Sequence, residues 1–427
     1  MIIRVKDLAY WSMVILMVFP GYVEASKSTL VSMFATGSYV IILALFLALD
    51  RKRFLFRGTL IFLPLLMIAI VSSLGLFYDY PFYDVVKDLW YLLNPVLILL
   101  CGYILFSHIR DIVSLVHAIV MSSAILALMH LSSFIINPEY LTDNYLNIRG
   151  EVSKGVLVVS LALALCVYHF FSSQKIIKLP SVLLGLISII LFVSIVLSFS
   201  RTVWLVLFIM LFFLFGFHLL RYWYIKLWVI LCGVIIVVLV AWFSNISGAE
   251  EKSFAWKLLR SIDEISSDDS DIHKNWRGYE SYRAALVYNE SMLIQKIFGH
   301  GAGYSLDMEV YVKLGGMEYR YIPWLHNGYW YVLLKAGAFG FLFYFIFFWL
   351  AWRHTSCNGK VFFTDFASNL SLGIIVTLMI TTIITAGAYN KTSLMQFLLA
   401  LGALSQYFSL YKRKAKVILV NRGNLLT

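Results

Sequence analysis

Long uninterrupted apolar runs are the feature that most constrains how this chain can fold. Many of them hold about 17 to 25 residues, the length at which an α-helix crosses the hydrocarbon core of a bilayer. Hydrophobic residues make up 61% of the 427 residues and charged residues only 13%, whereas soluble domains carry about 25% charged residues. Because so much apolar surface cannot be buried in a water-soluble core, we expect an integral membrane protein.

The apolar runs predict an all-α fold, a polytopic transmembrane helical bundle with one large, partly helical periplasmic loop. Twelve spans are expected, near residues 8–23, 29–49, 58–77, 89–106, 112–136, 152–172, 179–199, 201–219, 223–243, 328–352, 364–387 and 393–411. The chain then divides into residues 1–243 with helices one to nine, the loop at residues 244–327, and residues 328–427 with the last three helices and a basic cytoplasmic tail.

The distribution of basic residues predicts the orientation of the bundle in the membrane. With the first residue in the cytoplasm, basic clusters such as Arg51-Lys52-Arg53 and Lys412-Arg413-Lys414 fall on one side. Both termini are then cytoplasmic in a bacterial inner membrane, and residues 244–327 are periplasmic. The net charge of +11 therefore reflects orientation, and no nucleic acid partner is expected.

Two further features bear on the class of protein. The start of the chain, with Arg4 and Lys6 before an apolar run to Val23, resembles a secretory signal, but among so many spans we expect an uncleaved first helix. The cysteines are widely spaced, with no CxxC pair, at Cys101, Cys166, Cys232 and Cys357. Neither a disulfide framework nor a metal site is indicated.

Arg201 lies between two apolar runs with almost no loop around it. A charge at membrane depth costs about 2.5 to 3.5 kcal/mol on insertion scales, so such a residue normally has a partner or a function. The alternative is an interfacial arginine whose side chain extends to the lipid headgroups.

Arg277 and Arg283 lie six residues apart in the loop, with Glu280 between them. Arginine suits diphosphate because its planar fork donates paired hydrogen bonds and stays charged. The alternative is a solvated helix face on which these arginines pair with Glu280 and Glu290.

His326 lies where the loop re-enters the membrane, and a neutral imidazole there could accept a proton from a hydroxyl. A lone histidine is more often structural. Lys335 follows within the apolar helix, which means either that it faces a polar cavity or that the helix begins deeper in the loop.

Two motifs resemble nucleotide sites only superficially. The glycine-rich segment at residues 299–303 follows no predicted strand, and Asp269-Ser270-Asp271 resembles the metal-binding pair of nucleotide-sugar enzymes. Both lie on the side of the membrane where nucleotides are absent, so we reject both interpretations.

Three segments together share a pattern with one family. They are Ser200-Arg201-x-x-Trp204-Leu205, the run from Arg277 to Ala285 that leads to Phe298-Gly299-His300-Gly301-Ala302-Gly303-Tyr304, and His326-Asn327 followed by nine residues, Gly337, two residues and Gly340. Over about residues 145 to 345 the chain resembles the O-antigen ligase and polymerase superfamily of bacterial membrane glycosyltransferases. Arg149-Gly150 is a weaker match, and Lys335 stands where many relatives have an acidic residue.

The resemblance implies a donor glycan on undecaprenyl diphosphate and an acceptor sugar hydroxyl carried by a lipid or a glycan. It implies catalytic roles for His326, Arg277 and Arg201, in which the arginines hold the diphosphate and His326 orients or deprotonates the acceptor. Further contacts to diphosphate or glycan are expected from Arg283, Arg149, Arg320 and Asn327. Because a neutralised diphosphate is a good leaving group, we expect no metal and no cofactor. Besides the bilayer, other polysaccharide-assembly membrane proteins are expected partners.

Several functions remain open within and beyond this resemblance. A ligase joins a finished glycan to an acceptor lipid, whereas a polymerase extends the glycan by one repeat unit. The spacing of His326, Asn327 and Gly337 is typical of ligases but occurs across the superfamily, so a lipid A-core ligase is slightly favoured over an O-antigen or exopolysaccharide polymerase. A transporter of lipid-linked glycans would also use arginines, but neither paired repeats nor broken helices are evident. A purely structural scaffold leaves Arg201 unexplained.

Overall fold

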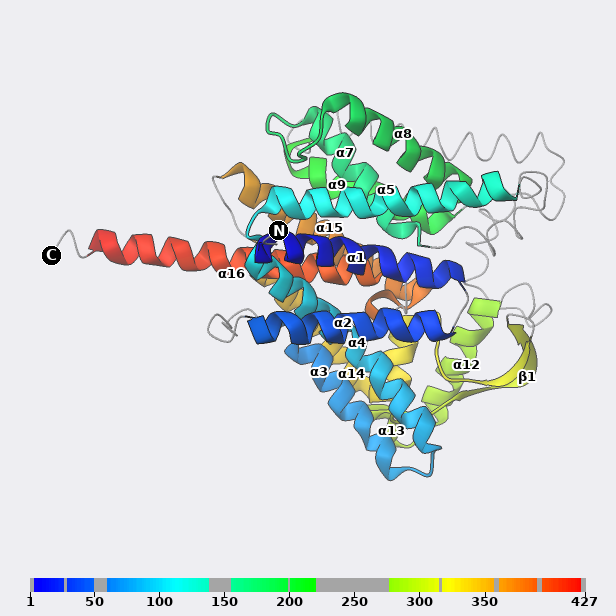
Figure 1. Ribbon diagram of the computed structural model, residues 1–427. Coiled ribbons are helices and arrows are strands. Elements are labelled where there is room, and N and C mark those ends of the chain that lie inside the picture. Colours follow the sequence, from blue (N-terminus) through cyan, green and yellow to red (C-terminus); the bar gives the residue numbers. More distant parts are fainter. Residues whose placement is uncertain are drawn as a thin grey trace.

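The computed structural model describes residues 4–26, 29–49, 60–137, 155–198, 200–219, 276–314, 317–356, 361–389 and 394–423, and helices dominate them (Figure 1). The apolar runs form helices because a helix satisfies its own backbone hydrogen bonds, which lipid cannot do. Up to α9 the elements are α1 (Val5–Ser26), α2 (Thr29–Leu49), α3 (Leu63–Ser72), the 3-10 helix η2 (Ser73–Phe77), α4 (Phe82–Ile109), α5 (Ile112–Ile136), α7 (Leu157–Phe171), α8 (Ser181–Leu197) and α9 (Arg201–Leu219).

The second half contains the rest of the bundle and the described part of the large loop. Its elements are α12 (Trp276–Glu290), α13 (Leu293–Phe298), β1 (Leu306–Leu314), β2 (Met317–Ile322), α14 (Gly328–Thr355), α15 (Phe362–Thr385), the 3-10 helix η5 (Gly387–Tyr389) and α16 (Met395–Gly423).

Helices occur at eleven of the twelve predicted spans, and the remaining one, residues 223–243, lies outside the described residues. Among the described helices, α4, α5, α14 and α15 are long and apolar enough to cross a membrane by length and composition alone. Others, such as α7, α8 and α9, are shorter apolar helices. The helical membrane fold is therefore confirmed, while the count of twelve crossings stays a prediction.

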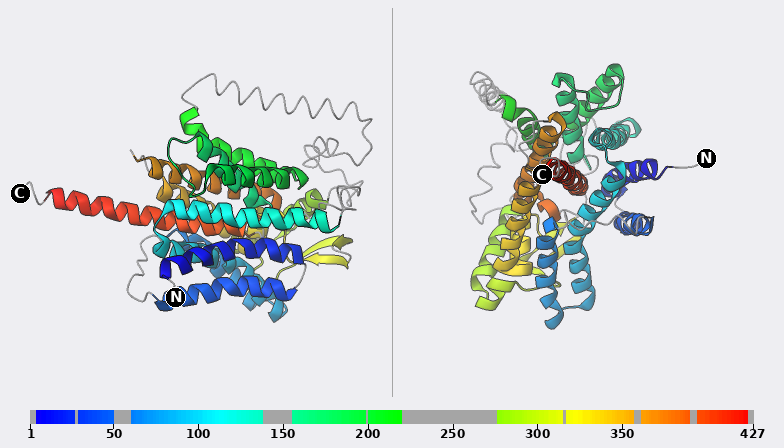
Figure 2. Two further views of the ribbon diagram at one scale, coloured as in Figure 1. Left: turned by 45° about the horizontal axis from the view of Figure 1, so that its top comes forward. Right: turned by 90° about the vertical axis from the view of Figure 1, so that its left-hand side faces the viewer.

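The long helices pack side by side, and the loop elements gather at one end of the bundle. In Figure 2 (left), the strands lie at the opposite end from the start of α1 and the end of α16. We call the end with the strands the hairpin end. The backbones of α4 and α16 approach closely at two glycines, since a Cβ at Gly102 would lie 2.0 Å from the Leu399 carbonyl oxygen and one at Gly402 would lie 2.1 Å from that of Leu99. Small residues commonly allow such close helix pairs in membranes.

The described part of the loop contains an antiparallel hairpin that departs from the all-α expectation. Leu306 pairs with Ile322 and Asp307 with Tyr321, and a bulge follows before Val312 pairs with Tyr319. Apolar residues alternate along β1 with the period of two that is typical of a strand. The helical part predicted for the loop is present as α12 and α13.

α14 is kinked at Gly337, where φ is 64° and ψ is −165°. The glycine-rich segment at residues 299–303 packs against this kink. The backbone N–H of His300 donates to the Leu334 carbonyl at 2.7 Å, and that of Gly301 donates to the Lys335 carbonyl at 3.1 Å. A Cβ at Gly337 would lie 2.3 Å from the Ile297 carbonyl oxygen. The kink therefore supplies both the space and the acceptors that dock this segment.

A buried ion pair joins α14 to α4. The Lys335 ammonium contacts the Asp88 carboxylate and the Tyr304 carbonyl, and the Gly303 N–H donates to Asp88 Oδ2 at 2.8 Å. The two side chains are 3% and 1% exposed. α14 begins at Gly328 as the sequence predicts. Lys335 is thus accommodated by a partner, and the helix does not begin deeper in the loop.

Replacing Gly337 with alanine should destabilise the protein. A positive φ is strained for a side chain by about 1 to 3 kcal/mol, and the added Cβ would also clash with the segment docked on the kink. The matched control is Gly185→Ala in α8, where a Cβ would meet nothing within 4 Å. The thermal unfolding temperature in detergent should fall for Gly337→Ala alone, and equal values for the two variants would contradict this account.

Replacing Lys335 with methionine leaves the Asp88 carboxylate buried without its cation, which typically costs about 3 to 5 kcal/mol. Thermal unfolding should show a large loss of stability that the second change Asp88→Asn partly restores. Lys87→Met is the control, because the pair of Lys87 with Asp84 is part-exposed and such pairs contribute about 0 to 1 kcal/mol. An equal effect of the two lysine variants would show that burial of the pair is unimportant.

Candidate functional site

His326 is held by the buried carboxylate of Glu280 from α12. The backbone N–H of His326 donates to Glu280 Oε1 at 2.5 Å, and His326 Nδ1 lies 2.9 Å from Oε2. The Glu280 side chain is 1% exposed, whereas that of His326 is 29% exposed. A carboxylate is an acceptor, so this contact places the ring proton on Nδ1 and leaves Nε2 as the acceptor. Nε2 of this partly exposed imidazole is thus left able to accept a proton.

The segment around His326 is fixed by the start of α14 and the end of α15. Asn327 is the N-cap of α14, and its side-chain oxygen accepts from the N–H groups of Tyr329 and Trp330 at 3.1 and 3.4 Å. The His326 carbonyl accepts from the Ala386 N–H at 2.5 Å. Asn327, predicted as a substrate contact, therefore positions the histidine beside it through the helix cap.

Glu280 is the residue that the sequence did not single out for function. It was considered only as a partner that would neutralise Arg277 or Arg283, yet the structure pairs it with His326, 46 residues away. In the sequence, the only sign of a role for Glu280 is its place three positions after Arg277 on a predicted helix. This sign does not identify His326 as its partner.

α12 presents Arg277, Glu280 and Arg283 at intervals of three residues. Each step of three turns the helix by about −60°, so the three side chains spread over adjacent faces. Arg277 is exposed, Glu280 is buried and Arg283 is part-buried. Arg277 is therefore the arginine of this helix that is open to solvent next to the histidine's carboxylate.

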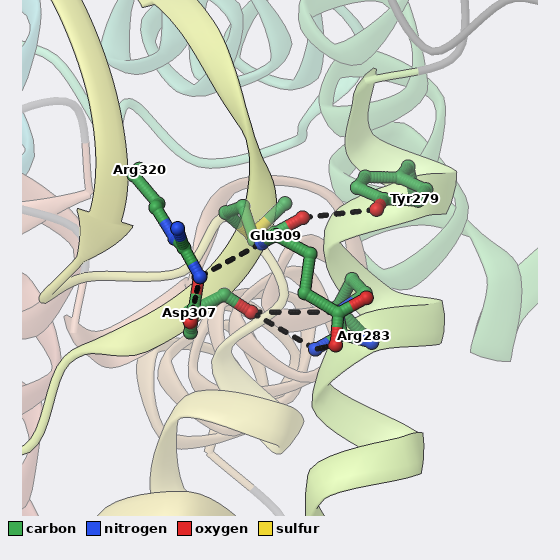
Figure 3. A network of polar contacts seen from close by, with 6 residues as sticks. Tyr279, Arg283, Asp307, Glu309 and Arg320 are labelled. Atoms are coloured by element: carbon green, nitrogen blue, oxygen red, sulfur yellow. Dashed lines mark hydrogen bonds and ion pairs between the residues drawn. The ribbon is translucent and has the colours of Figure 1, made fainter.

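Arg283 and Arg320 both bind carboxylates of the hairpin (Figure 3). Arg283 pairs with Glu309 at 2.8 Å and contacts the Asp307 carbonyl, while Arg320 forms a bidentate pair with Asp307 at 2.9 and 3.0 Å. The hydrogen bond from Arg320 is the main cause that lowers the pKa of Asp307. Tyr279 adds a further bond from its hydroxyl to the Met308 carbonyl at 2.9 Å. Arg283 and Tyr279 therefore join α12 to the hairpin, whereas Arg320 joins its two strands.

Arg201, at the first position of α9, lies at the level of His326. α9 and α15 run antiparallel, since Thr377 contacts the Met210 sulfur at 3.7 Å and Gly373 lies beside Phe213. Both helices rise about 1.5 Å per residue. Ala386, whose N–H donates to the His326 carbonyl, lies nine residues after Thr377. Arg201 lies nine residues before Met210. The pairing of these helices therefore brings Arg201 to the hairpin end. Arg149 lies outside the described residues.

The glycine-rich segment at residues 299–303 does not cradle an anion. Its N–H groups donate to carbonyls of Leu334, Lys335 and Ser72, and to the Asp88 carboxylate. His300 Nε2 lies 2.8 Å from Ser291 Oγ, and its ring stacks on Tyr304 at 4.3 Å. Burial and the nearby Lys335 lower the pKa of His300. This segment is structural, and within the described part of the chain no three His, Cys, Asp or Glu side chains are grouped as metal ligands.

The comparisons with known proteins agree with this geometry. Residues 186–345 match the family described as O-antigen ligase, and they include Arg201, α12, the hairpin and His326. No curated protein matches the chain. The apolar helices identify a multi-pass membrane protein, and its residues 186–345 are similar to the O-antigen ligase family.

Proposed function

We propose that the chain is a membrane glycosyltransferase that moves a glycan from undecaprenyl diphosphate to an acceptor sugar hydroxyl. The observation that carries this proposal is the contact of His326 with buried Glu280, beside the exposed Arg277. A histidine oriented by a carboxylate can accept a hydroxyl proton at its free nitrogen. A cation beside it can neutralise the diphosphate that leaves.

In the proposed reaction the acceptor hydroxyl oxygen attacks the anomeric carbon of the donor sugar. The bond from this carbon to the phosphate oxygen breaks, and undecaprenyl diphosphate leaves with the electron pair. The hydroxyl proton passes to His326 Nε2. The Glu280 carboxylate then stabilises the imidazolium through the bond at Nδ1, as an acidic partner does in other catalytic dyads and triads.

Arg277 and Arg201 are the arginines that we assign to the diphosphate. Arg277 is exposed one helical turn from Glu280, and the pairing of α9 with α15 brings Arg201 to the level of His326. Two cations approaching from different helices could hold both phosphates and so stabilise the leaving group. Arg283 and Arg320, whose forks contact hairpin carboxylates, are assigned to the hairpin instead.

We place the hairpin end of the bundle in the periplasm. Basic residues mark the other end, where Lys178 pairs with Asp111 at the start of α5 and Lys412 bonds to the His354 carbonyl near the end of α14. Lysine and arginine favour the cytoplasmic side of a membrane protein. In this orientation His326 would lie at the boundary where a lipid-borne donor meets a periplasmic acceptor.

A lipid A-core ligase remains slightly favoured, and a polymerase of the same superfamily is the alternative. A gel profile of surface and lipid-linked glycans from cells that lack the protein separates the two. Long chains that stay on the lipid carrier would identify a ligase, and single repeat units on the acceptor would identify a polymerase. An unchanged profile would contradict both and favour a transporter or scaffold.

His326→Ala and Arg277→Ala should abolish glycan transfer, and Glu280→Gln should slow it by about 10²-fold or more, because each removes part of the base or the leaving-group contact. The matched control is Glu290→Gln, an exposed change on the same helix, which should be silent. Complementation of deletion cells, read on glycan gels with protein level measured in membranes, tests the set. Normal surface glycan with His326→Ala would overturn the assignment.

Arg201→Lys should also transfer glycan poorly, because an ammonium cannot reproduce the paired hydrogen bonds of a guanidinium. Arg353→Lys, near the opposite end of the bundle, is the control and should retain activity. The same complementation gels provide the readout. Full activity of Arg201→Lys would instead support an interfacial arginine that contacts headgroups.

A further inference from the structure

The hairpin exposes three tyrosines that its own packing does not need. Tyr311, Tyr321 and Tyr319 are 66%, 58% and 39% exposed, whereas Leu306, Met308 and Ile322 of the same strands are 1%, 0% and 6% exposed. The strands therefore already have a buried apolar side. Exposed aromatic side chains gathered on one element commonly mark a binding surface.

Arg320 lies among these tyrosines in a fixed orientation. Its guanidinium is 5.6 Å from the Tyr321 ring, and Tyr311 is also within electrostatic range. Asp307 occupies the Nε and one terminal nitrogen of the fork. Because Arg320 also lowers the pKa of Asp307, the carboxylate stays ionised and the pair carries no net charge.

This arrangement suits sugar rings better than a diphosphate. The paired edge of the Arg320 fork is occupied, and the Asp307 carboxylate would repel a second anion. The remaining N–H groups of the arginine and the free lone pairs of the carboxylate can bond to hydroxyl groups, which both donate and accept. Tyrosine rings offer flat faces on which the C–H side of a pyranose can pack.

The position of the hairpin relates it to the donor. It is tied to α12, the helix of Glu280 and Arg277, through Arg283 and Tyr279 (Figure 3). It projects beyond the ends of α1 and α2 (Figures 1 and 2), at the end of the bundle that we place in the periplasm. A glycan joined to a diphosphate near Arg277 has to run away from the bilayer, in the direction in which the hairpin projects.

We propose that Tyr311, Tyr321 and the pair of Arg320 with Asp307 form a binding platform for the sugar rings of the lipid-linked donor glycan. This inference rests on the proposed function, because it assumes that the diphosphate binds near Arg277. It separates the contacts of the donor into two sets. The arginines outside the hairpin hold the diphosphate, and the hairpin holds the glycan.

The test compares two probes on the full-length protein in nanodiscs. One is undecaprenyl diphosphate without sugar, and the other is the lipid-linked glycan extracted from cells that lack the protein. The double variant Tyr311→Ala, Tyr321→Ala should weaken binding of the glycan probe about tenfold, the effect expected for two lost aromatic contacts. Binding of undecaprenyl diphosphate should not change. Tyr83→Ala, which removes a 73% exposed tyrosine at the start of α4, is the control and should bind both probes normally.

The outcomes separate this inference from the function on which it rests. If the double variant binds the glycan probe as tightly as the wild type, the platform is wrong. If only the KM for the acceptor rises in a transfer assay, the assignment to the donor is overturned. If the wild type binds neither probe and His326→Ala transfers glycan normally, the proposed function fails, and the platform fails with it.

Discussion

The buried pair of Asp88 and Lys335 is the interaction on which the hairpin end of the bundle depends. It joins α4 to α14, and the same carboxylate and ammonium bind the backbone at Gly303 and Tyr304. Two charges buried inside the bundle are stable only because each satisfies the other and the loop supplies the remaining hydrogen bonds. Three segments far apart in the sequence are thereby fixed relative to one another.

The kink at Gly337 extends this constraint from the membrane helices to Glu280 and His326, the two residues of the proposed catalytic dyad. It frees the carbonyls of Leu334 and Lys335 for the segment that follows α13, so that segment lies against α14. The chain on one side of the segment leads back to α12 with Glu280, and the chain on the other leads through the hairpin to His326. The chain segments that carry Glu280 and His326 are thus both positioned by the kink at Gly337. The spacing of His326 and Gly337, which is part of the resemblance to the O-antigen ligase family, therefore has a physical reason in this fold.

Sequence reasoning succeeded where the signal is local and failed where it depends on packing. Apolar runs predicted the helices, because lipid leaves an apolar segment no other way to satisfy its backbone. His326 was singled out because it lies where the loop re-enters the membrane, and Arg201 because it lies between two apolar runs; their roles stay predictions. The partner of His326 is 46 residues away and that of Lys335 is 247 residues away, so neither could be identified from one sequence. The hairpin was missed because its alternating pattern is short and lies beside stronger helical ones.

The arginines show most clearly that residue type alone does not decide which candidate residues form a site. Arg277, Arg283 and Arg320 are equivalent by chemistry, and the sequence offered all three to the substrate. Glu309 and Asp307 bind Arg283 and Arg320 and convert them into supports for the hairpin. A cation that neutralises a leaving group must be able to reach it, whereas the carboxylate that orients a base works best when it is buried. The three-residue step from Arg277 to Glu280 meets both requirements on one helix, because Arg277 is exposed to solvent and the buried Glu280 carboxylate contacts the histidine.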